Sequence, residues 1–232
     1  YICHCDSDDW CEKDCYKSLY TKAIKEDADV VICDYKTINE NGESLVVNAC
    51  NFTTHNELLY DVSSQRISPS VWNKMVKRNL YNEVVFYPQH GMGEDMVLTI
   101  QLLNRAKNVV HLREPLYCYF INSQSMSFKP GKEAILKRFY QIKENTDLVI
   151  KYIENYATYD VAQSIIDQLC YNSISQIQNL IYYDKSIRRI WLTQYPGLFK
   201  RLLMSYRFPI IKKMQIILTF INVYPFPKDR VK

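Results

Sequence analysis

The sequence predicts an α/β layer over residues 1–128, followed by an α-helical region over residues 129–232. In the first part, β-branched runs such as ADVVICDY at 28–35 alternate with segments of helical periodicity, which is typical of a sheet covered by helices. The second part opens with Pro130-Gly131 and is almost entirely helical in its pattern. We therefore expect a domain boundary between the two parts.

Strands and helices alternate in the first part. Residues 36–68 are polar, include an Asn41-Gly42 turn and are expected to be irregular. Elsewhere, periodicity and β-branched runs predict the end of a strand at 1–5, helices over 11–27, 70–81 and 94–106, a buried strand over 28–35, and short strands over 108–112 and 116–121 separated by Glu114-Pro115.

The second part is expected to consist of helices alone. Pro196-Gly197 and Pro209 separate the last three of them, because proline does not continue a helix. The predicted helices cover 132–155, 158–183, 185–194, 198–206 and 210–222.

The composition excludes several classes of protein. With 47% hydrophobic and 23% charged residues, the 232-residue chain is too apolar to be mainly disordered. Its five glycines form neither a GxGxxG nor a GxxxxGK[ST] motif, which argues against dinucleotide folds of that type and against P-loop NTPases. No apolar run reaches the ~18–20 residues that cross a bilayer.

Charge is unevenly distributed along the chain. Residues 188–232 carry a net charge of +9, whereas residues 1–187 carry −5. A basic tail on an acidic body predicts an anionic partner for the tail. Residues 198–221 mix Lys and Arg with large apolar side chains, which indicates either an anionic membrane surface or helices with basic outer faces. Nucleic acid is not expected, because no RRM, KH or helix-turn-helix pattern occurs.

The chain has eight cysteines. A chain of this size buries a core without disulfides, so we expect buried reduced thiols and a cytoplasmic location. A zinc site is the alternative for one cluster that lacks a paired CxxC: Cys3, His4, Cys5, Cys11 and Cys15.

Carboxylates gather in Asp6-Ser7-Asp8-Asp9-Trp10, directly after the first predicted strand. In extended backbone, Asp6 and Asp8 point to one face, and ligand sites of α/β sheets lie beyond strand ends. Two carboxylates there suit Mg²⁺ or Mn²⁺, which prefer oxygen ligands. The alternative is a solvated acidic turn in which Asp9 caps the following helix.

A second acidic group, Gly93-Glu94-Asp95, opens the helix predicted over 94–106. A catalytic base at this position would face the ligand edge of the sheet. The alternative is that the two acids only complement the helix dipole, which leaves the glycines at 91 and 93 unexplained.

Three further groups are weaker candidates. The indole of Trp72 is expected in the core, with an exposed Lys74 after it. His90 is more often structural than a ligand, and Ser125 and Ser127 suit a polar loop. These groups are Trp72-Asn73-Lys74, His90, and Ser125-Met126-Ser127.

Across about residues 1–128, the sequence resembles family 2 glycosyltransferases with the GT-A fold, most of all bacterial enzymes that build capsular, exopolysaccharide or lipopolysaccharide chains. The resemblance implies metal-dependent, inverting transfer of a sugar from a nucleotide sugar, UDP-linked, to a saccharide hydroxyl. It rests on five segments in the family's order and spacing: DSDDW at 6–10, ADVVICDY at 28–35, VWNK at 71–74, GED at 93–95 and LYCYFINSQSMS at 116–127.

The resemblance implies a role for each matching acid. Asp6 and Asp8 match the family's DxD motif, with Asp8 as ligand of Mn²⁺ or Mg²⁺ and Asp6 near the ribose or the metal. Asp9 would support the site. The metal would neutralise the diphosphate and stabilise the leaving group. Asp95 matches the general base that takes the proton of the acceptor hydroxyl, and Glu94 would orient the acceptor or the base.

The remaining matches line the predicted binding pockets. Trp72 and Asn73, with Lys74, are implied on the donor side, because their segment lines the sugar pocket in the family. On the acceptor side, the implied pocket residues are His90, Gly93, Ser125 and Ser127.

The start of the chain departs from the family. Members begin with a strand-loop unit of VSVIIPVYN type, well before the DxD motif, whereas this sequence starts almost at that motif. We therefore expect the second half of the catalytic domain, N-terminally incomplete, with a helical region after it. A basic tail on the inner face of the cell membrane would place a lipid-linked acceptor nearby. The alternatives are a catalytically incomplete remnant, acting as a membrane-peripheral or assembly module, and a metal-dependent phosphate-transfer enzyme.

Overall fold

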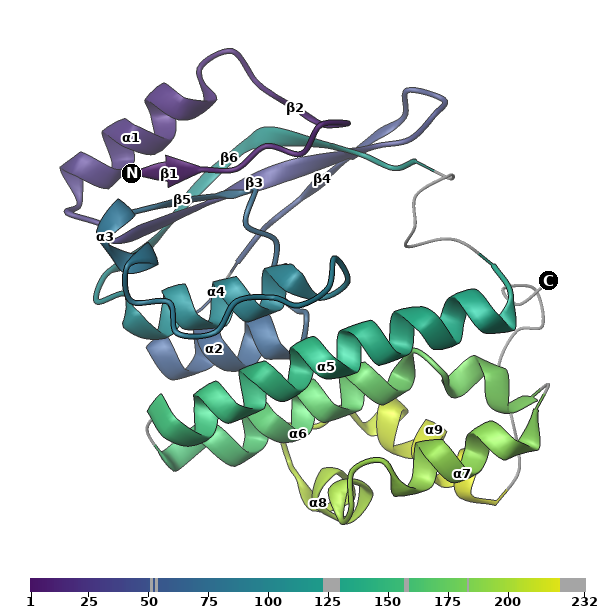
Figure 1. The fold of residues 1–232 in the computed structure, drawn as a ribbon. Coiled ribbons are helices and arrows are strands. Elements are labelled where there is room, and N and C mark those ends of the chain that lie inside the picture. The colour runs from purple at the N-terminus through teal and green to yellow at the C-terminus, as the bar shows by residue number, and fades with distance from the viewer. Residues whose placement is uncertain (51, 53, 123–129, 157–158, 183, 222–232) are drawn as a thin grey trace.

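The structure is a computed structural model that describes the chain except residues 51, 53, 123–129, 157–158, 183 and 222–232. A twisted sheet lies between one helix on its outer face and successive layers of helices on its inner face (Figure 1). The predicted fold class, an α/β layer with a helical C-terminal region, is confirmed.

The sheet is built around its central strand, β3. Its order is β1-β5-β3-β6-β2, and β4 pairs with the outer half of β3. β3 and β6 run parallel, while every other described pair is antiparallel. The strands are β1 (Ile2–Cys3), β2 (Trp10–Cys11), β3 (Val30–Ile38), β4 (Ser44–Val47), β5 (Lys74–Val76) and β6 (Val109–Phe120).

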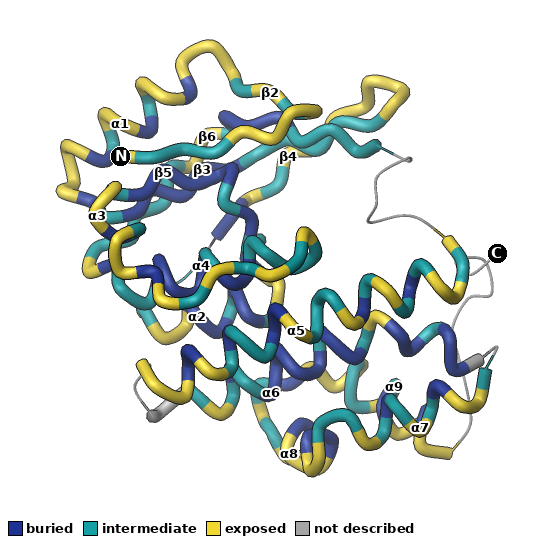
Figure 2. The backbone as a smooth tube through the Cα atoms, in the orientation of Figure 1, coloured by how far each residue is buried: buried dark blue, intermediate teal, exposed yellow. Residues whose placement is uncertain are grey.

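The two faces of the sheet take alternate residues of β3, because successive side chains of a strand point to opposite sides. Val31 and Cys33 pack against α1 (Cys15–Lys25) on the outer face. Val30 and Ile32 belong to the larger core on the inner face, which α2 (His55–Ser63) and α4 (Glu94–Arg105) cover. The first residues of β3 are therefore buried from both sides, as the dark tube of Figure 2 shows.

The helical region shares a core with the α/β layer. Val149, Ile153 and Leu169 pack in the same buried cluster as the inner face of the sheet. A second cluster forms around Trp191 and Phe199, whose rings stack at 4.1 Å. The elements of this region are α5 (Lys132–Tyr156), α6 (Tyr159–Ser175), a 3₁₀ turn (Gln178–Tyr182), α7 (Lys185–Thr193), α8 (Leu198–Met204) and α9 (Ile210–Phe220).

Three local predictions were wrong. The polar stretch 36–68 contains β4 and α2, whose N-cap Thr54 accepts a hydrogen bond from the backbone N–H of Glu57 at 3.2 Å. Over 70–81, a single helix is replaced by β5 and the four-residue α3 (Arg78–Tyr81), because pairing with β1 and β3 overrides helical periodicity.

The third error concerns the last strand. Two strands were predicted on either side of Glu114-Pro115, whereas β6 runs unbroken through them. A register shift opposite Cys33 and Asp34 absorbs the extra residues, so Pro115 lies at an irregularity where its missing N–H breaks no ladder.

The cysteines are free thiols, and five of the eight are buried. Within the described residues, no group of three His, Cys, Asp or Glu side chains is placed to hold a metal ion, so the alternative zinc cluster has no support. None of the helices in the described part of the chain has the length and apolarity to cross a membrane.

Truncation of Ile153 tests the continuity of the core. Ile153 is fully buried where α5 meets the α/β layer, so Ile153→Ala should lower the free energy of unfolding by about 2–5 kcal/mol in one cooperative transition. Urea denaturation followed by tryptophan fluorescence measures this. Ile24→Ala, at a 57% exposed position on α1, is the matched control and should have little effect. Two separate transitions, with only one shifted, would contradict a shared core.

Candidate active site

The acidic turn that carries the Asp-Ser-Asp motif is held against β6 by Tyr117. The Tyr117 hydroxyl donates a hydrogen bond to Oδ2 of Asp9 at 2.8 Å and accepts one from the backbone N–H of Asp6 at 3.0 Å. The other carboxylate oxygen of Asp9 accepts from the backbone N–H of Phe120 at 2.7 Å. Asp9 therefore fixes the turn and does not cap α1, whose N-cap position is taken by Asp14.

Trp72 packs under the ring that holds this turn. Its indole stacks on Tyr117, with ring centroids 4.4 Å apart, and on Tyr119 at 5.5 Å, and it meets Tyr35 edge-on at 4.9 Å. The indole is buried, so what it does in this structure is fix the position of Tyr117.

Asp6 and Asp8 face solvent beside the anchored turn. Partial burial raises the pKa of Asp6, the neighbouring Asp8 raises it further, and His4 opposes both effects. Because the hydrogen bonds that fix the turn use Asp9, the carboxylates of Asp6 and Asp8 are open to a ligand.

The second acidic group lies at the start of α4, as predicted. Gly93 is the N-cap residue and has a left-handed backbone, with φ of 83°, which glycine adopts without strain. A Cβ at this position would lie 3.7 Å from the Cα of Ile142 on α5. The glycine thus allows the chain to turn sharply into α4 while it packs closely on α5.

Asp95 is a carboxyl group with a strongly raised pKa. Burial raises the pKa of Asp95 to about 7, Glu94 and Asp6 contribute in the same direction, and Lys74 opposes them. Burial, and then Asp6, also raise the pKa of Glu94. The structure therefore brings the two acidic motifs, separate in the sequence, into electrostatic contact at one site.

Lys74 is a buried cation behind Asp95. Its Nζ donates hydrogen bonds to the carbonyl oxygens of Ser68 (2.9 Å) and Ser70 (2.5 Å) and to Oδ1 of Asn73 (2.8 Å). Burial lowers the pKa of Lys74 to about 8, although Asp95 acts against that change. The lysine is thus buried and not exposed, contrary to the sequence-based expectation, and with Asn73 it fixes the loop that precedes β5.

The glycine loop before α4 is held by one amide side chain on α5. Asn145 is 1% exposed. Its Nδ2 donates to the carbonyl oxygens of His90 and Met92, both at 2.9 Å, and its Oδ1 accepts from the backbone N–H of Gln89 at 3.0 Å. The sequence carried no signal for Asn145, because its partners lie more than fifty residues away, and Tyr117, although it lies in the matched segment 116–127, was given no role.

The other three predicted pocket positions are His90, Ser125 and Ser127. The Nε2 atom of His90 lies 2.6 Å from Oε2 of Glu144 on α5, so its imidazole is directed to that helix. Ser125 and Ser127 lie outside the described residues, and their roles stay predictions.

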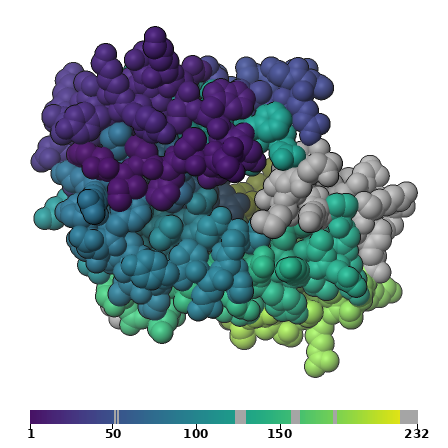
Figure 3. Space-filling view, turned by 45° about the horizontal axis from the view of Figure 1, so that its top comes forward, coloured from purple at the N-terminus to yellow at the C-terminus, as the bar shows by residue number. Residues whose placement is uncertain are grey.

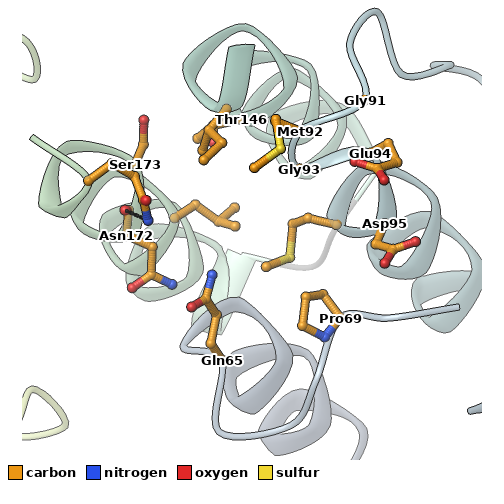
Figure 4. A pocket seen from close by; sticks show the side chains of 14 residues that line it. Gln65, Pro69, Gly91, Met92, Gly93, Glu94, Asp95, Thr146, Asn172 and Ser173 are labelled. Atoms are coloured by element: carbon orange, nitrogen blue, oxygen red, sulfur yellow. Dashed lines mark hydrogen bonds between the residues drawn. The ribbon is translucent and has the colours of Figure 1, made fainter. Parts of the chain in front are cut away.

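A cavity of about 270 Å³ lies beside the N-terminus of α4. Glu94 and Asp95 stand at its edge with their carboxylates directed away from its centre (Figure 4). The surface is also hollowed between the N-terminal residues, in purple, and the teal and green surface below them (Figure 3). The cavity is lined by apolar Met92, Met96, Ile142 and Leu169 and by uncharged polar Gln65, Thr146, Asn172, Ser173 and Gln176.

A divalent cation would fit the open carboxylates of Asp6 and Asp8. Magnesium-type ions keep several water ligands and bind one or two carboxylates together with substrate phosphates, so a third protein ligand is not required. Asp8 and Asp6 are therefore the residues that could hold such an ion.

No protein-family model matches the chain, but curated relatives do. The chain is 28% identical over 138 residues to the glycosyltransferase GlyA of Streptococcus pneumoniae serotype 4, a match that covers 55% of this chain and 20% of that protein. It is 23% identical over 227 residues to the uncharacterized glycosyltransferase YibD of Escherichia coli K12, covering 89% and 64%. The chain thus spans less than two thirds of either relative.

Solved structures of S. aureus TarS have a similar fold. The crystal structure of a 1–349 segment matches with a TM-score of 0.51 and 16% identity, covering 95% of this chain and 55% of that one. The same segment has been solved with UDP-GlcNAc, where the match has a TM-score of 0.47, 14% identity and coverage of 91% and 70%. The chain is therefore similar in sequence to glycosyltransferases, and it shares the fold of TarS.

Proposed function

We propose that the chain transfers a sugar from a nucleotide sugar, UDP-linked, to a hydroxyl of a saccharide acceptor, with inversion at the anomeric carbon, in the synthesis of a surface polysaccharide. One observation carries the proposal. Two open carboxylates, Asp6 and Asp8, lie on a fixed turn, and one of them, Asp6, helps to raise the pKa of Asp95 to about 7. A cation and diphosphate site beside a carboxyl group suited to proton transfer is what glycosyl transfer needs. The names of the curated relatives support this class of reaction.

The donor side is assigned to the anchored turn. Asp8, with Asp6, would hold Mn²⁺ or Mg²⁺, which when bound supplies positive charge opposite the diphosphate. Asp9 and Tyr117 keep the turn in place. Trp72, Asn73 and Lys74 are buried, so they support the donor side from the interior of the protein.

Asp95 is assigned as the general base. A pKa of about 7 leaves part of the population ionised at neutral pH while keeping the carboxylate basic enough to take a proton. The acceptor oxygen gives its proton to Asp95 and forms the bond to the anomeric carbon. The bond from that carbon to the diphosphate breaks, and its electron pair leaves with the phosphate oxygen. Attack from the side opposite the leaving group inverts the configuration.

The acceptor is assigned to the cavity beside α4. Its uncharged amides and hydroxyls can exchange hydrogen bonds with sugar hydroxyls, and its apolar walls suit the C–H face of a sugar ring. Gly93 lines this cavity, and His90 lies in the adjacent loop. A sugar bound there would contribute binding energy away from the reacting hydroxyl, which can be used to position that hydroxyl at Asp95.

Calorimetric titration of UDP tests the donor site. We expect binding that depends on Mn²⁺ and is lost in Asp8→Asn, because the variant removes a charged oxygen ligand. Asp14→Asn is the matched control: it removes one exposed carboxylate that makes no capping hydrogen bond, and it should bind UDP normally. Binding that is indifferent to Mn²⁺ or to Asp8→Asn would contradict the donor site. A folded chain that binds no UDP would favour the non-catalytic module.

Asp95→Asn should stabilise the fold at pH 8. The native Asp95 keeps its proton up to about pH 7, whereas in the unfolded chain the proton is lost near 3.8. The native state therefore loses stability as the pH rises through this window, and the variant should not. The difference should reach about 2–4 kcal/mol at pH 8 and vanish near pH 4, measured by urea denaturation at both values.

The same variant separates binding from chemistry. Asp95→Asn should bind UDP and Mn²⁺ like the unchanged chain but lower sugar transfer by about 10²–10⁴-fold, as expected for a lost general base. Transfer at a near-normal rate would show that another group takes the proton. Asp14→Asn should change neither the rate nor the pH dependence of stability.

A further inference from the structure

Helix α9 presents an apolar stripe to solvent. Its opposite side is covered, since Ile216 and Thr219 are fully buried against the other helices. A surface helix normally turns its only apolar stripe toward the core, so a second stripe on the outer side is not explained by folding. The stripe follows helical spacing, and its residues are 69%, 56%, 48% and 61% exposed: Ile210, Met214, Ile217 and Ile221.

The exposed apolar surface extends to either side of this stripe. Ile211 is 68% exposed next to it. Met204, the last residue of α8, is 77% exposed, and Tyr206, in the turn before α9, is 88% exposed. Clustered apolar exposure of this kind marks an interaction site, whereas isolated exposed residues need no explanation. We call Ile210, Ile211, Met214, Ile217 and Ile221 the docking face.

The charge around the docking face has one sign. Between residues 185 and 221 the chain carries eight Lys and Arg side chains and no Asp or Glu. Lys213 follows the first turn of α9, and Lys212 extends over the ring of Tyr171, with Nζ 5.2 Å from its centroid. Arg207 lies between two tyrosines, 5.4 and 5.7 Å from their ring centroids. Basic groups therefore border an apolar stripe.

An apolar stripe bordered by positive charge indicates which kind of partner binds the docking face. Two copies of the chain meeting through the docking face would bring basic segments together, and a nucleic acid would leave the apolar stripe exposed. An anionic lipid surface satisfies both features, because acyl chains take the apolar side chains and headgroup phosphates take the cations. An 11-residue helix is about 16 Å long, too short to cross a bilayer but suited to lie in its interface.

We propose that α9 docks the protein on an anionic membrane surface, with the docking face inserted at the boundary between headgroups and acyl chains. Lys213 and Arg207 contact lipid phosphates at its border. α9 lies in the helical region, away from the sheet (Figure 1), and the turn before it contacts α2, where the Tyr60 hydroxyl donates a hydrogen bond to the carbonyl oxygen of Arg207 at 3.3 Å.

Vesicle flotation with the full chain tests this proposal. We expect binding to vesicles of equal parts phosphatidylcholine and phosphatidylglycerol, no binding to phosphatidylcholine alone, and release at high salt. Met214→Glu with Ile217→Glu should weaken binding about tenfold or more, and Lys213→Ala about fivefold. The matched control is Ile24→Glu, at a 57% exposed position on α1, which should bind normally. Circular dichroism and the urea midpoint verify the fold of each variant.

Three outcomes would overturn the proposal. They are no vesicle binding by the folded chain, equal binding to neutral vesicles, and unchanged binding of the Met214→Glu, Ile217→Glu variant. If that variant instead turns a dimer into a monomer in analytical ultracentrifugation, the docking face belongs to a second copy. UDP binding should be unaffected in the variant, so the result is independent of the proposed transferase activity.

Discussion

The hydroxyl of Tyr117 is the contact on which the candidate active site depends. It lies in the centre of the sheet, 1% exposed, and its ring is fixed by the stacked indole of Trp72. From there it holds both ends of the acidic turn, through the N–H of Asp6 and the carboxylate of Asp9. Because the carboxylate of Asp9 makes this contact, the carboxylates of Asp6 and Asp8 remain open to a ligand. The register shift in β6 just before Tyr117 is what places the ring beneath the turn.

The site is held in a state that folding alone would not favour. Asp95 is a carboxyl group whose charged form is opposed by burial and by two other acids, and Lys74 is a cation whose charged form is opposed by burial. Lys74 lowers the pKa of Asp95 and Asp95 raises the pKa of Lys74, so each favours the charged form of the other. Both pKa values nevertheless remain displaced from their ordinary values toward 7. A group held near neutrality exchanges protons readily at physiological pH, so the same burial that lowers the stability of the fold suits Asp95 to the role of base that we propose for it.

The sequence was informative where one local pattern decides the structure. The start of α4 after Gly93, the buried β3 and the boundaries of α7 to α9 follow from periodicity and from glycine and proline positions. It failed where distant pairing decides. The segment 70–81 reads as helical, but Lys74–Val76 within it form β5 because β1 and β3 pair with it on either side. The acidic motifs were found separately, and only the fold shows that Asp6 acts on Asp95. The roles of Tyr117, which lies in the matched segment 116–127, and of Asn145 could not be assigned, because a tyrosine in a strand and an asparagine in a helix carry no sign of their partners.

The acidic part of the chain, residues 1–187, and the basic part, residues 188–232, would respond in opposite ways to an anionic membrane. In the proposed function the acidic site needs a cation to receive a diphosphate, and on its own it would be repelled by anionic lipid. The basic residues around α9 would be attracted by the same lipid. Since the acidic turn lies at the sheet and α9 lies in the helical region, the two forces act on different parts of the molecule (Figure 1). Attraction through α9 and repulsion of the acidic turn both favour an orientation in which the active site opens away from the headgroups.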